Sequence, residues 1–319
     1  MTAPLQSEGV VAIKADGLTK SFPGVRAVDG LSFDVRAGEI FGLVGPDGAG
    51  KTTTLRMLAG ILPPDAGSAT VAGCDVARNA ERAKHSLSYM PQRFGLYEDL
   101  TVDENIRFYA DLFGVHKAER IDRSLQLLTA AGMSEFRRRL AGKLSGGMKQ
   151  KLGLVCALIH RPKVILLDEP TTGVDPVSRR DFWRILYELV AEGVAILTST
   201  AYLDEAERCH RVALMNQGKL LFCDTPANLK AHFGKDVLSV ASAEPRQLRT
   251  CLENAPGISS LVLTGDGVHV VVDQAARRVP EFELLLSKSN VGVHSIQQVT
   301  PSIEDLFVDA VSGGGPRHD

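Results

Sequence analysis

Short apolar runs alternate with segments of helical periodicity up to about residue 235. Glu39–Val44 is an apolar run that ends in a glycine-rich turn, and Lys51–Leu62 after it carries leucines at helical spacing. Lys163–Leu167 and Val194–Leu197 are two further apolar runs of strand length. Strands without polar positions are typical of a parallel sheet that helices cover on both faces. The pattern therefore predicts an α/β core of repeated strand–helix units.

Other elements of this core follow from shorter patterns. Asp175 and Pro176 suit the N-cap and the first position of a helix. Val10–Ala15 and Leu31–Val35 alternate between apolar and polar residues enough to predict strands. Ser86–His160 has a mostly helical pattern and predicts a helical insert in the core. We expect residues 1–235, including this insert, to form one domain.

Beyond residue 235 the order of the expected elements changes. Two apolar runs flank the turn Gly265-Asp266-Gly267, which is a hairpin signal, and a helix is expected on either side of this hairpin. The order βαββαβ predicts a small ferredoxin-like α+β module over residues 236–312. Thr300 and Pro301 are expected to start a final helix, and the tail 313–319 is expected to be disordered. The expected elements are Val237–Val240, Pro245–Asn254, Ile258–Leu263, Val268–Val272, Pro280–Ser287 and Val291–Val299.

The composition limits what the chain can be. Hydrophobic residues make up 44% and charged residues 23%, as in ordinary soluble globular proteins. The 36 basic and 38 acidic residues give a net charge of −2, which argues against nucleic acid as the main partner. No stretch approaches the roughly 20 apolar residues of a membrane-spanning helix, and Met1–Gly9 has no signal-peptide pattern. The five cysteines are odd in number and lack CxxC spacing, so neither a disulfide framework nor a zinc site is expected.

The glycine-rich turn between a predicted strand and a predicted helix matches the P-loop pattern in full. Glycines let the backbone wrap a triphosphate with inward N–H groups, and the helix N-terminus adds its dipole. Lys51 supplies a point charge for the β- and γ-phosphates, and the Thr52 hydroxyl is a hard oxygen ligand suited to Mg²⁺. We expect Asp47 to point outward and cap the turn. The predicted ATP-binding residues here are Gly45, Pro46, Asp47, Gly48, Ala49, Gly50, Lys51, Thr52 and Thr53.

A pair of acids at a strand end forms the second part of the predicted phosphate site. Val164–Leu167 is apolar and leads directly into Asp168 and Glu169. P-loop enzymes hold Mg²⁺ through an acid at the end of such a strand, so Asp168 is the expected Mg²⁺-linked carboxylate. Glu169 follows at once and is the expected general base for the attacking water. The two segments together predict binding and hydrolysis of Mg-ATP.

The segment Leu144-Ser145-Gly146-Gly147-Met148 indicates which group of P-loop enzymes this chain resembles. It resembles the LSGGQ signature of ABC ATPases, with Met148 in place of the usual glutamine, and the resemblance covers about residues 10–235. It implies a P-loop (RecA-like) ABC ATPase core with a helical insert, followed by the small C-terminal α+β domain. Ser145 and the N–H groups of Gly146 and Gly147 would form a second anion nest. In the family this nest caps the ATP on the P-loop of a partner subunit.

The resemblance also implies roles for residues outside these loops. Phe22 stands where the family stacks an aromatic ring on adenine. Gln92 stands in the Q-loop, where it would contribute to Mg²⁺ binding and catalysis together with Lys51. Asp175 stands in the D-loop. These positions complete the set of family motifs in their usual order.

Two further segments resemble bacterial drug exporter ATPases whose permease is a separate polypeptide. They are Tyr89–Thr101, around the Q-loop, and Thr300–Phe307, at the end of the accessory domain. Some of these ATPases carry two halves in tandem, of which this chain holds one. The resemblance implies two partners, membrane permease subunits and a second, identical or different ATPase subunit, and a peripheral position on the cytoplasmic face of the cell membrane. Drug or multidrug efflux is implied by likeness alone, because the permease decides the substrate.

One position departs from the family pattern. Ala201 follows the last core strand where most relatives have a histidine that touches the γ-phosphate, and a methyl group cannot donate a hydrogen bond. His210 stands too far along the chain to be an obvious substitute. Loss of such a group typically costs about 100- to 10,000-fold in rate. We expect this chain's own site to hydrolyse slowly and its signature to complete a faster site on a different ATPase half; the alternative is a homodimer in which Glu169 suffices.

Two other interpretations stay open. A binding-only regulatory half would also account for Ala201. A soluble ABC ATPase that acts on DNA, RNA or ribosomes would carry coiled-coil inserts, zinc motifs or basic arms, which this sequence does not show. The one notable basic cluster is Arg137-Arg138-Arg139, where a solvated face or a permease contact is expected.

Overall fold

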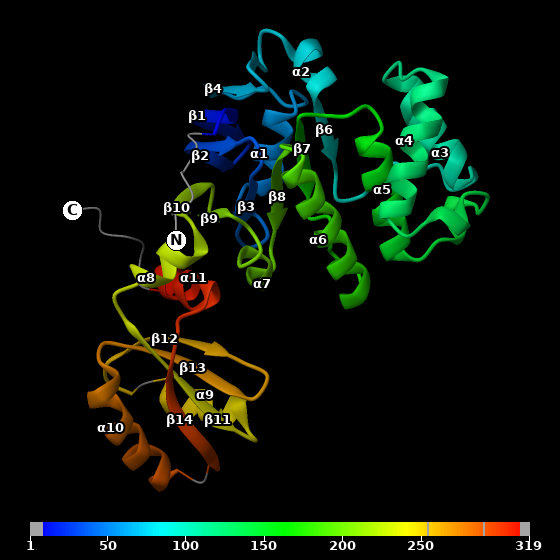
Figure 1. Ribbon diagram of the computed structural model, residues 1–319. Coiled ribbons are helices and arrows are strands. Elements are labelled where there is room, and N and C mark those ends of the chain that lie inside the picture. The colour runs from blue at the N-terminus through cyan, green and yellow to red at the C-terminus, as the bar shows by residue number, and fades with distance from the viewer. Residues whose placement is uncertain (1–8, 254, 290, 313–319) are drawn as a thin grey trace, which may run out of the picture. The chain divides into compact units, whose positions relative to one another are not determined.

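The computed structural model describes residues 9–253, 255–289 and 291–312 of the chain (Figure 1). The chain divides into two compact units, Met1–Ala201 with Cys209–Leu220 and Tyr202–Arg208 with Leu221–Asp319. The predicted domain boundary after residue 235 falls within the second unit, and the expected tail 313–319 lies outside the described residues. Within the described ranges, every helix is too short or too polar to cross a membrane.

The first unit is built on a six-stranded sheet whose central strands are buried along their whole length. This holds for β3 (Ile40–Val44), β7 (Val164–Asp168) and β8 (Ala195–Thr200), as their apolar runs predict. The strand order is β10-β9-β3-β8-β7-β6, and the strands from β9 to β6 run parallel. The loops after β3, β7 and β8 therefore leave one common edge of the sheet. The other strands are β6 (Leu87–Met90), β9 (Arg211–Asn216) and β10 (Lys219–Asp224), and β10 continues past Leu220 into the second unit.

Helices of the first unit cover this sheet and extend beyond it. α5 (Gly146–Leu158) contacts β6, α3, α4 and α6, and α3 and α4 lie on its outer side (Figure 1). The region Ser86–His160 is mostly helical, as predicted, but Leu87–Met90 at its start is the edge strand β6, parallel to β7. The remaining helices are α1 (Lys51–Leu58), α2 (Ala80–Ser86), α3 (Val102–Leu112), α4 (Lys117–Ala130) and α6 (Pro176–Ala191), with 3₁₀ turns at Ser134–Phe136 and Ala141–Lys143.

A second, antiparallel sheet in the first unit is predicted by the sequence only in part. Its strand order is β2-β1-β4-β5. The two long strands contain the predicted alternating segments, whereas β4 is mostly exposed and β5 has only two, partly buried residues, so both give little periodic signal. The strands are β1 (Val11–Phe22), β2 (Val25–Arg36), β4 (Ala66–Val71) and β5 (Cys74–Asp75).

The second unit contains the predicted α+β module. Its strands form an antiparallel sheet in the order β12-β13-β11-β14, and α9 and α10 pack their apolar faces against it. The core includes Leu238, Leu248, Val270 and Phe282. The elements of this unit are α7 (Leu203–Ala206), α8 (Pro226–Ala231), β11 (Asp236–Ser242), α9 (Pro245–Leu252), β12 (Ile258–Leu263), β13 (Gly267–Val272), α10 (Ala275–Lys288), β14 (Val293–Val299) and α11 (Ile303–Ser312).

The predicted start of one helix in this unit is wrong. α10 begins at Ala275, so Pro280 lies inside the helix and not at its first position. The Ala275 N–H donates to Asp236 Oδ2 at 2.7 Å, which satisfies a donor at the helix start. A proline inside a helix removes one backbone hydrogen bond, which is why the sequence pattern favours a start at the proline itself.

Candidate functional site

The loop between β3 and α1 requires glycine at two positions. Gly50 is the N-cap of α1 with φ 101°, and a Cβ there would lie 2.3 Å from the carbonyl oxygen of Ala27. A Cβ on Gly45 would lie 2.3 Å from the carbonyl oxygen of Met215. Both positions therefore tolerate no side chain. The tight turn that results leads into the first N–H groups of α1, which are donors suited to phosphate.

A cavity of about 490 Å³ opens along this loop. All of the predicted ATP-binding residues except Gly45 and Pro46 line it, together with Gln92 and Glu169. Phe22 is 45% exposed, which suits a ring that stacks on a flat ligand. Asp47 is exposed as well, and no hydrogen bond reaches its carboxylate from the described residues, so the expected cap of the turn is not formed.

Lys51 is a buried cation with a complete set of partners. Its side chain is 4% exposed. Its Nζ donates to the carbonyl oxygens of Gly45 at 2.7 Å and Pro46 at 3.0 Å, and it lies 3.2 Å from Glu169 Oε1. A buried ammonium group needs such partners. They hold the positive charge between the P-loop and the acid that follows β7.

Hydroxyl groups hold the Asp168 carboxylate at the end of β7. Its Oδ1 accepts hydrogen bonds from Thr52 Oγ1 at 2.9 Å and Ser199 Oγ at 2.8 Å, and its Oδ2 accepts one from the Tyr89 hydroxyl at 3.2 Å. Burial and the Asp168 charge raise the pKa of Tyr89 to about 12, so the hydroxyl keeps its proton. The sequence pattern misses Tyr89 and Ser199, because their contacts depend on the register of β6 and β8 beside β7.

Glu169 adopts a strained backbone conformation. Its φ is 48°, in the left-handed region that costs a residue with a side chain about 1–3 kcal/mol. Its N–H group donates to Ser199, to Oγ at 3.1 Å and to the carbonyl oxygen at 3.2 Å. Its Oε2 accepts from Gln92 Nε2 at 3.2 Å and from Thr172 Oγ1 at 3.4 Å. Strain of this kind is found at functional sites, and here it brings the carboxylate of Glu169 to Lys51 and Gln92.

The oxygen atoms at this site fit a magnesium ion bound together with phosphate. The Thr52 hydroxyl and the Asp168 carboxylate are hard oxygen donors that meet beside the P-loop cavity, and Gln92 lines that cavity with its amide nitrogen bound to Glu169. Mg²⁺ binds through one or two protein oxygens together with phosphate groups and water. No group of three or more histidine, cysteine or acidic residues among the described residues could hold a metal.

The signature segment and Asp175 lie together at the starts of α5 and α6. Ser145 is the N-cap of α5, and its Oγ accepts from the Met148 N–H at 3.3 Å. Asp175 caps α6 by accepting from the Ser178 N–H at 2.9 Å, as predicted, and this bond lowers the pKa of Asp175. A Cβ on Gly147 would lie 2.4 Å from Ser178 Oγ, so the two helix starts are in contact. Neither the signature residues Ser145–Met148 nor Asp175 is among the described residues that line the P-loop cavity.

Residue 201 lies at the sheet edge that carries the P-loop and the two acids. The Gly45 N–H donates to the carbonyl oxygen of Thr200 at 3.3 Å, and Asp168 is in register with Ser199 on the next strand. Ala201 follows directly and is exposed. The sequence therefore places a methyl group directly after the end of β8.

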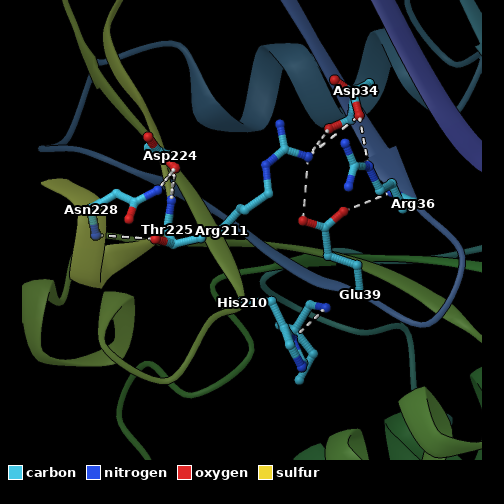
Figure 2. A network of polar contacts seen from close by, with 9 residues as sticks. Asp34, Arg36, Glu39, His210, Arg211, Asp224, Thr225 and Asn228 are labelled. Carbon is cyan, nitrogen blue, oxygen red and sulfur yellow. Dashed lines mark hydrogen bonds and ion pairs between the residues drawn. The ribbon is translucent and has the colours of Figure 1, made fainter. Parts of the chain in front are cut away.

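His210 belongs to the opposite end of the sheet. Its ring Nδ1 accepts from the backbone N–H of Ile40 at 3.1 Å. Its backbone N–H donates to the carbonyl oxygen of Ile40 at 2.9 Å, at the start of β3. Figure 2 shows it below Glu39, whose carboxylate binds Arg211 Nη1 at 3.4 Å and the Arg36 N–H at 2.7 Å. The P-loop follows the other end of β3, so His210 cannot replace the missing histidine.

An apolar groove lies on another surface of the first unit. It has a volume of about 430 Å³ and is lined by α2, β6 and the ends of α1 and α3. Ile61 is 59% exposed and Leu112 66% exposed. Leu87, Tyr89 and Phe113 contribute further apolar surface. Glu81, Lys84 and His85 of α2 also line the groove.

Two protein families match separate parts of the chain. Residues 28–172 match ABC transporter, a range that contains the P-loop, the signature and both acids. Residues 225–311 match ATP-binding protein DrrA1-3-like, C-terminal domain. The second range covers the α+β module.

Several named proteins are similar over almost the whole chain. It is 47% identical over 307 residues to the probable multidrug ABC transporter ATP-binding protein YbhF of Escherichia coli (strain K12), covering 95% of this chain but only 52% of that protein. It is 37% identical to the Nod factor export ATP-binding protein I of Burkholderia thailandensis, covering 94% of this chain and 96% of that protein. It is 35% identical to the daunorubicin resistance ATP-binding protein DrrA2 of Streptomyces coeruleorubidus, covering 93% and 94%.

Solved structures support the same fold. The structure of an ATP binding subunit of an ABC transporter superimposes with a TM-score of 0.64 at 30% identity, covering 70% of this chain and 93% of that one. CbiO1 of Clostridium perfringens, part of the ABC transporter complex CbiONQ, superimposes with a TM-score of 0.65 at 23% identity, covering 77% and 96%. The second likeness shows the fold alone.

Proposed function

The chain belongs to the family of ABC transporter ATP-binding proteins, and on that premise we propose that it binds and hydrolyses Mg-ATP to drive an exporter with a separate permease. One observation carries the proposal: Lys51, Thr52, Gln92 and Glu169 line one cavity, and Asp168 binds Thr52 at its edge. These groups are a cation for phosphate, oxygen ligands for Mg²⁺ and a base for water.

The geometry suggests one role for each group. Lys51 neutralises the β- and γ-phosphates beside the P-loop N–H groups. Thr52, Asp168 and Gln92 would hold Mg²⁺, which supplies positive charge at the phosphates when bound. Glu169 accepts the proton of the attacking water, and Gln92 and Thr172 fix its carboxylate through the bonds to Oε2.

The signature requires a second copy of the fold. Ser145, Gly146 and Gly147 present an anion nest at the start of α5, and they do not line the P-loop cavity of their own chain in its described part. We assign them to the nucleotide of a partner ATPase subunit. Met148 in place of glutamine leaves the serine hydroxyl and the glycine N–H groups in place, so the effect on phosphate binding is small.

Ala201 sets the expected rate of this chain's own site. Without a donor at position 201, Glu169 works with one fewer group near the γ-phosphate, and hydrolysis at this P-loop is slow. The partner is then a different ATPase half whose site is completed by Ser145, Gly146 and Gly147. An identical partner is the alternative.

The permease side of the proposal rests on the apolar groove and on the relatives. Ile61 and Leu112 offer exposed apolar surface to a helix of the permease. The named relatives concern multidrug transport, Nod factor export and daunorubicin resistance. We therefore propose export of drug-like compounds, with this chain at the cytoplasmic face of the cell membrane. Replacing Leu112 by Glu would reduce co-purification of the permease, because it places a charge on this apolar surface.

Steady-state ATP hydrolysis tests the proposal in three proteins side by side: wild type, Glu169→Gln and Ala201→His. We expect wild type to bind ATP and turn over slowly, Ala201→His to raise turnover, and Glu169→Gln to abolish it. Failure of wild type to bind ATP would overturn the nucleotide site. Fast wild-type turnover that Ala201→His leaves unchanged would instead favour a self-sufficient homodimer.

A binding-only regulatory half is the second candidate, and Ala201 is the observation that favours it. It predicts ATP binding in wild type and no hydrolysis in either wild type or Ala201→His, with or without a second ATPase half. The slow-site proposal predicts measurable hydrolysis in the Ala201→His protein. The same three-protein comparison therefore separates the two candidates.

A further inference from the structure

We infer that Tyr89 is a positioning residue that links the apolar groove to the Asp168 carboxylate, so that a partner in the groove changes how Mg-nucleotide is held. The inference rests on the proposed function, because it concerns the same carboxylate. It adds a role for the Tyr89 hydroxyl and a physical route between two surfaces.

One end of Tyr89 reaches the metal-binding carboxylate. The two oxygens of Asp168 have different partners: Oδ1 accepts from Thr52 and Ser199, and Oδ2 accepts from Tyr89 alone among the described residues. The Tyr89 hydroxyl therefore fixes the rotation of the carboxylate about its last bond. Partners of metal-binding side chains orient those side chains, and their loss typically lowers metal affinity by about 10- to 100-fold.

The other end of Tyr89 forms part of the groove wall. Tyr89 lines the groove together with Leu87, Leu112 and Phe113. It stands on β6, the last strand of its sheet, which is paired with β7 and has no further neighbour among the described strands. An edge strand is held on one side only and is more easily displaced than a central one. A partner in the groove would thus press on the residue that also binds Asp168.

The length of the hydrogen bond makes this link sensitive to small movements. The distance of 3.2 Å from the Tyr89 hydroxyl to Asp168 Oδ2 exceeds the range of about 2.5–3.0 Å for O–H···O bonds. A shift of a few tenths of an ångström toward Asp168 strengthens the bond, and an equal shift away removes it. The Arg56 guanidinium of α1 opposes part of the rise in the pKa of Tyr89.

The first experiment measures nucleotide binding without hydrolysis. Calorimetry gives the Kd of the full chain for a non-hydrolysable ATP analogue with Mg²⁺ and with EDTA, and the ratio is the gain from Mg²⁺. We expect Tyr89→Phe to reduce this gain about tenfold and to leave the Kd in EDTA unchanged. A gain equal to that of wild type would overturn the inference.

Tyr109 provides a matched control. It is also a partly buried tyrosine, and its hydroxyl donates to the carbonyl oxygen of Gly95 at 2.7 Å, not to the acids. Tyr109→Phe should leave the gain from Mg²⁺ as in wild type. An equal loss in Tyr89→Phe and Tyr109→Phe would mean that any lost tyrosine hydroxyl has this effect, and the positioning role would be wrong.

The second experiment tests the link to the groove. Leu112 is exposed, and Leu112→Trp places a large ring at the groove. We expect this change to alter the gain from Mg²⁺ several-fold in the wild-type background and not in the Tyr89→Phe background. An equal change in both backgrounds, or none in either, would overturn the link.

The same measurements separate this inference from the proposed function. A wild-type chain that does not bind the analogue would overturn both. A wild-type chain that binds the analogue with a clear gain from Mg²⁺, while Tyr89→Phe has the same gain, would overturn the inference alone.

Discussion

Two buried aspartates, one in each unit, have almost the same exposed fraction but different neighbours. Asp168 is 2% exposed and Asp305 is 0% exposed. Asp168 stands beside the P-loop cavity and precedes the strained Glu169. Asp305 accepts from the Ser302 N–H at 2.8 Å and hydroxyl at 2.7 Å, and both of its oxygens lie 3.2 Å from His269 Nδ1.

The difference lies in what each carboxylate can still bind. The partners of Asp168 among the described residues are neutral hydroxyl groups, and the nearby cation Lys51 pairs with Glu169. Hydroxyls orient a carboxylate without neutralising it, so its charge remains available to a metal ion. Asp305 is closed by a helix cap and by His269. A buried aspartate therefore indicates a binding site only where its neighbours orient it and leave its charge free.

Replacing Asp168 by Asn gives the largest effect expected from this comparison. The amide keeps the shape and still accepts from Thr52 and Ser199, but it loses the charge that would hold Mg²⁺. We expect hydrolysis to fall about 100-fold or more and the gain in nucleotide affinity from Mg²⁺ to disappear. Trp183 is the single tryptophan and lies in α6, so its fluorescence reports unfolding of the first unit. The free energy of unfolding that Trp183 fluorescence reports for the first unit should change by less than about 1 kcal/mol.

Normal hydrolysis by Asp168→Asn, or a large loss of stability in the first unit, would contradict the distinction between the two aspartates. The first result would mean that the charge is not needed. The second would mean that the Asp168 carboxylate is mainly structural, as we hold Asp305 to be.

The same substitution at Asp305 should have the opposite outcome. Asn cannot accept on both sides, so it loses either the His269 contact or part of the Ser302 cap. Loss of hydrogen bonds to a buried charged group costs about 2 kcal/mol. We expect the free energy of unfolding of the second unit to fall by this amount. Circular dichroism during urea unfolding should detect the change, and Trp183 fluorescence, which reports on the first unit, should not. Nucleotide affinity should be that of wild type, and a change in it would contradict a purely structural Asp305.

The local patterns of the sequence predict the groups that do chemistry better than the groups that hold them. The P-loop glycines, Asp168 and Glu169 follow one another along the chain and can be found by spacing. Tyr89 and Ser199 reach Asp168 from neighbouring strands, and only the register of β6, β7 and β8 brings them there. That register depends on the packing of the whole sheet.

Helices and strands, too, are predicted well where the local sequence decides them and poorly where contacts from distant residues do. Apolar runs predict the buried strands β3, β7 and β8, because burial on both faces leaves a strong signal. The mostly exposed β4 and the two-residue, partly buried β5 leave almost none. The start of α10 was predicted at Pro280 because that residue suits a first helical turn, whereas Asp236, far away in the sequence, accepts from the N–H of Ala275 and extends the helix.

Ser199 offers a smaller test of the same comparison. Its hydroxyl donates to Asp168 Oδ1 and accepts from the Glu169 N–H, so it supports both acids. We expect Ser199→Ala to lower hydrolysis about tenfold, because Asp168 and Glu169 lose part of their orientation. Ser260→Ala is the matched control, since Ser260 is 6% exposed and its Oγ has no hydrogen-bond partner in the described structure. Equal rates for the two variants would show that Ser199 does not position the acids.

The smallest effect is a dependence of the second unit on pH. The Asp305 hydrogen bond raises the pKa of His269 above its ordinary value. Burial alone would raise the pKa of Asp305, but hydrogen bonds from His269 and Ser302 lower it below its ordinary value. Asp305 therefore keeps its charge at neutral pH, and its charge favours the protonated form of His269.

A histidine whose pKa is raised by folding contributes its full stability below the unfolded pKa of about 6.5, and loses it as the pH rises through the folded pKa. We expect the second unit of wild type to lose about 1 kcal/mol between pH 6 and pH 9, the size of one hydrogen bond. His269→Gln should remove this dependence over the same interval. Urea unfolding followed by circular dichroism at the two pH values measures it. A wild-type curve as flat as that of His269→Gln would mean that the His269–Asp305 pair adds no stability, and that the capping box alone satisfies Asp305.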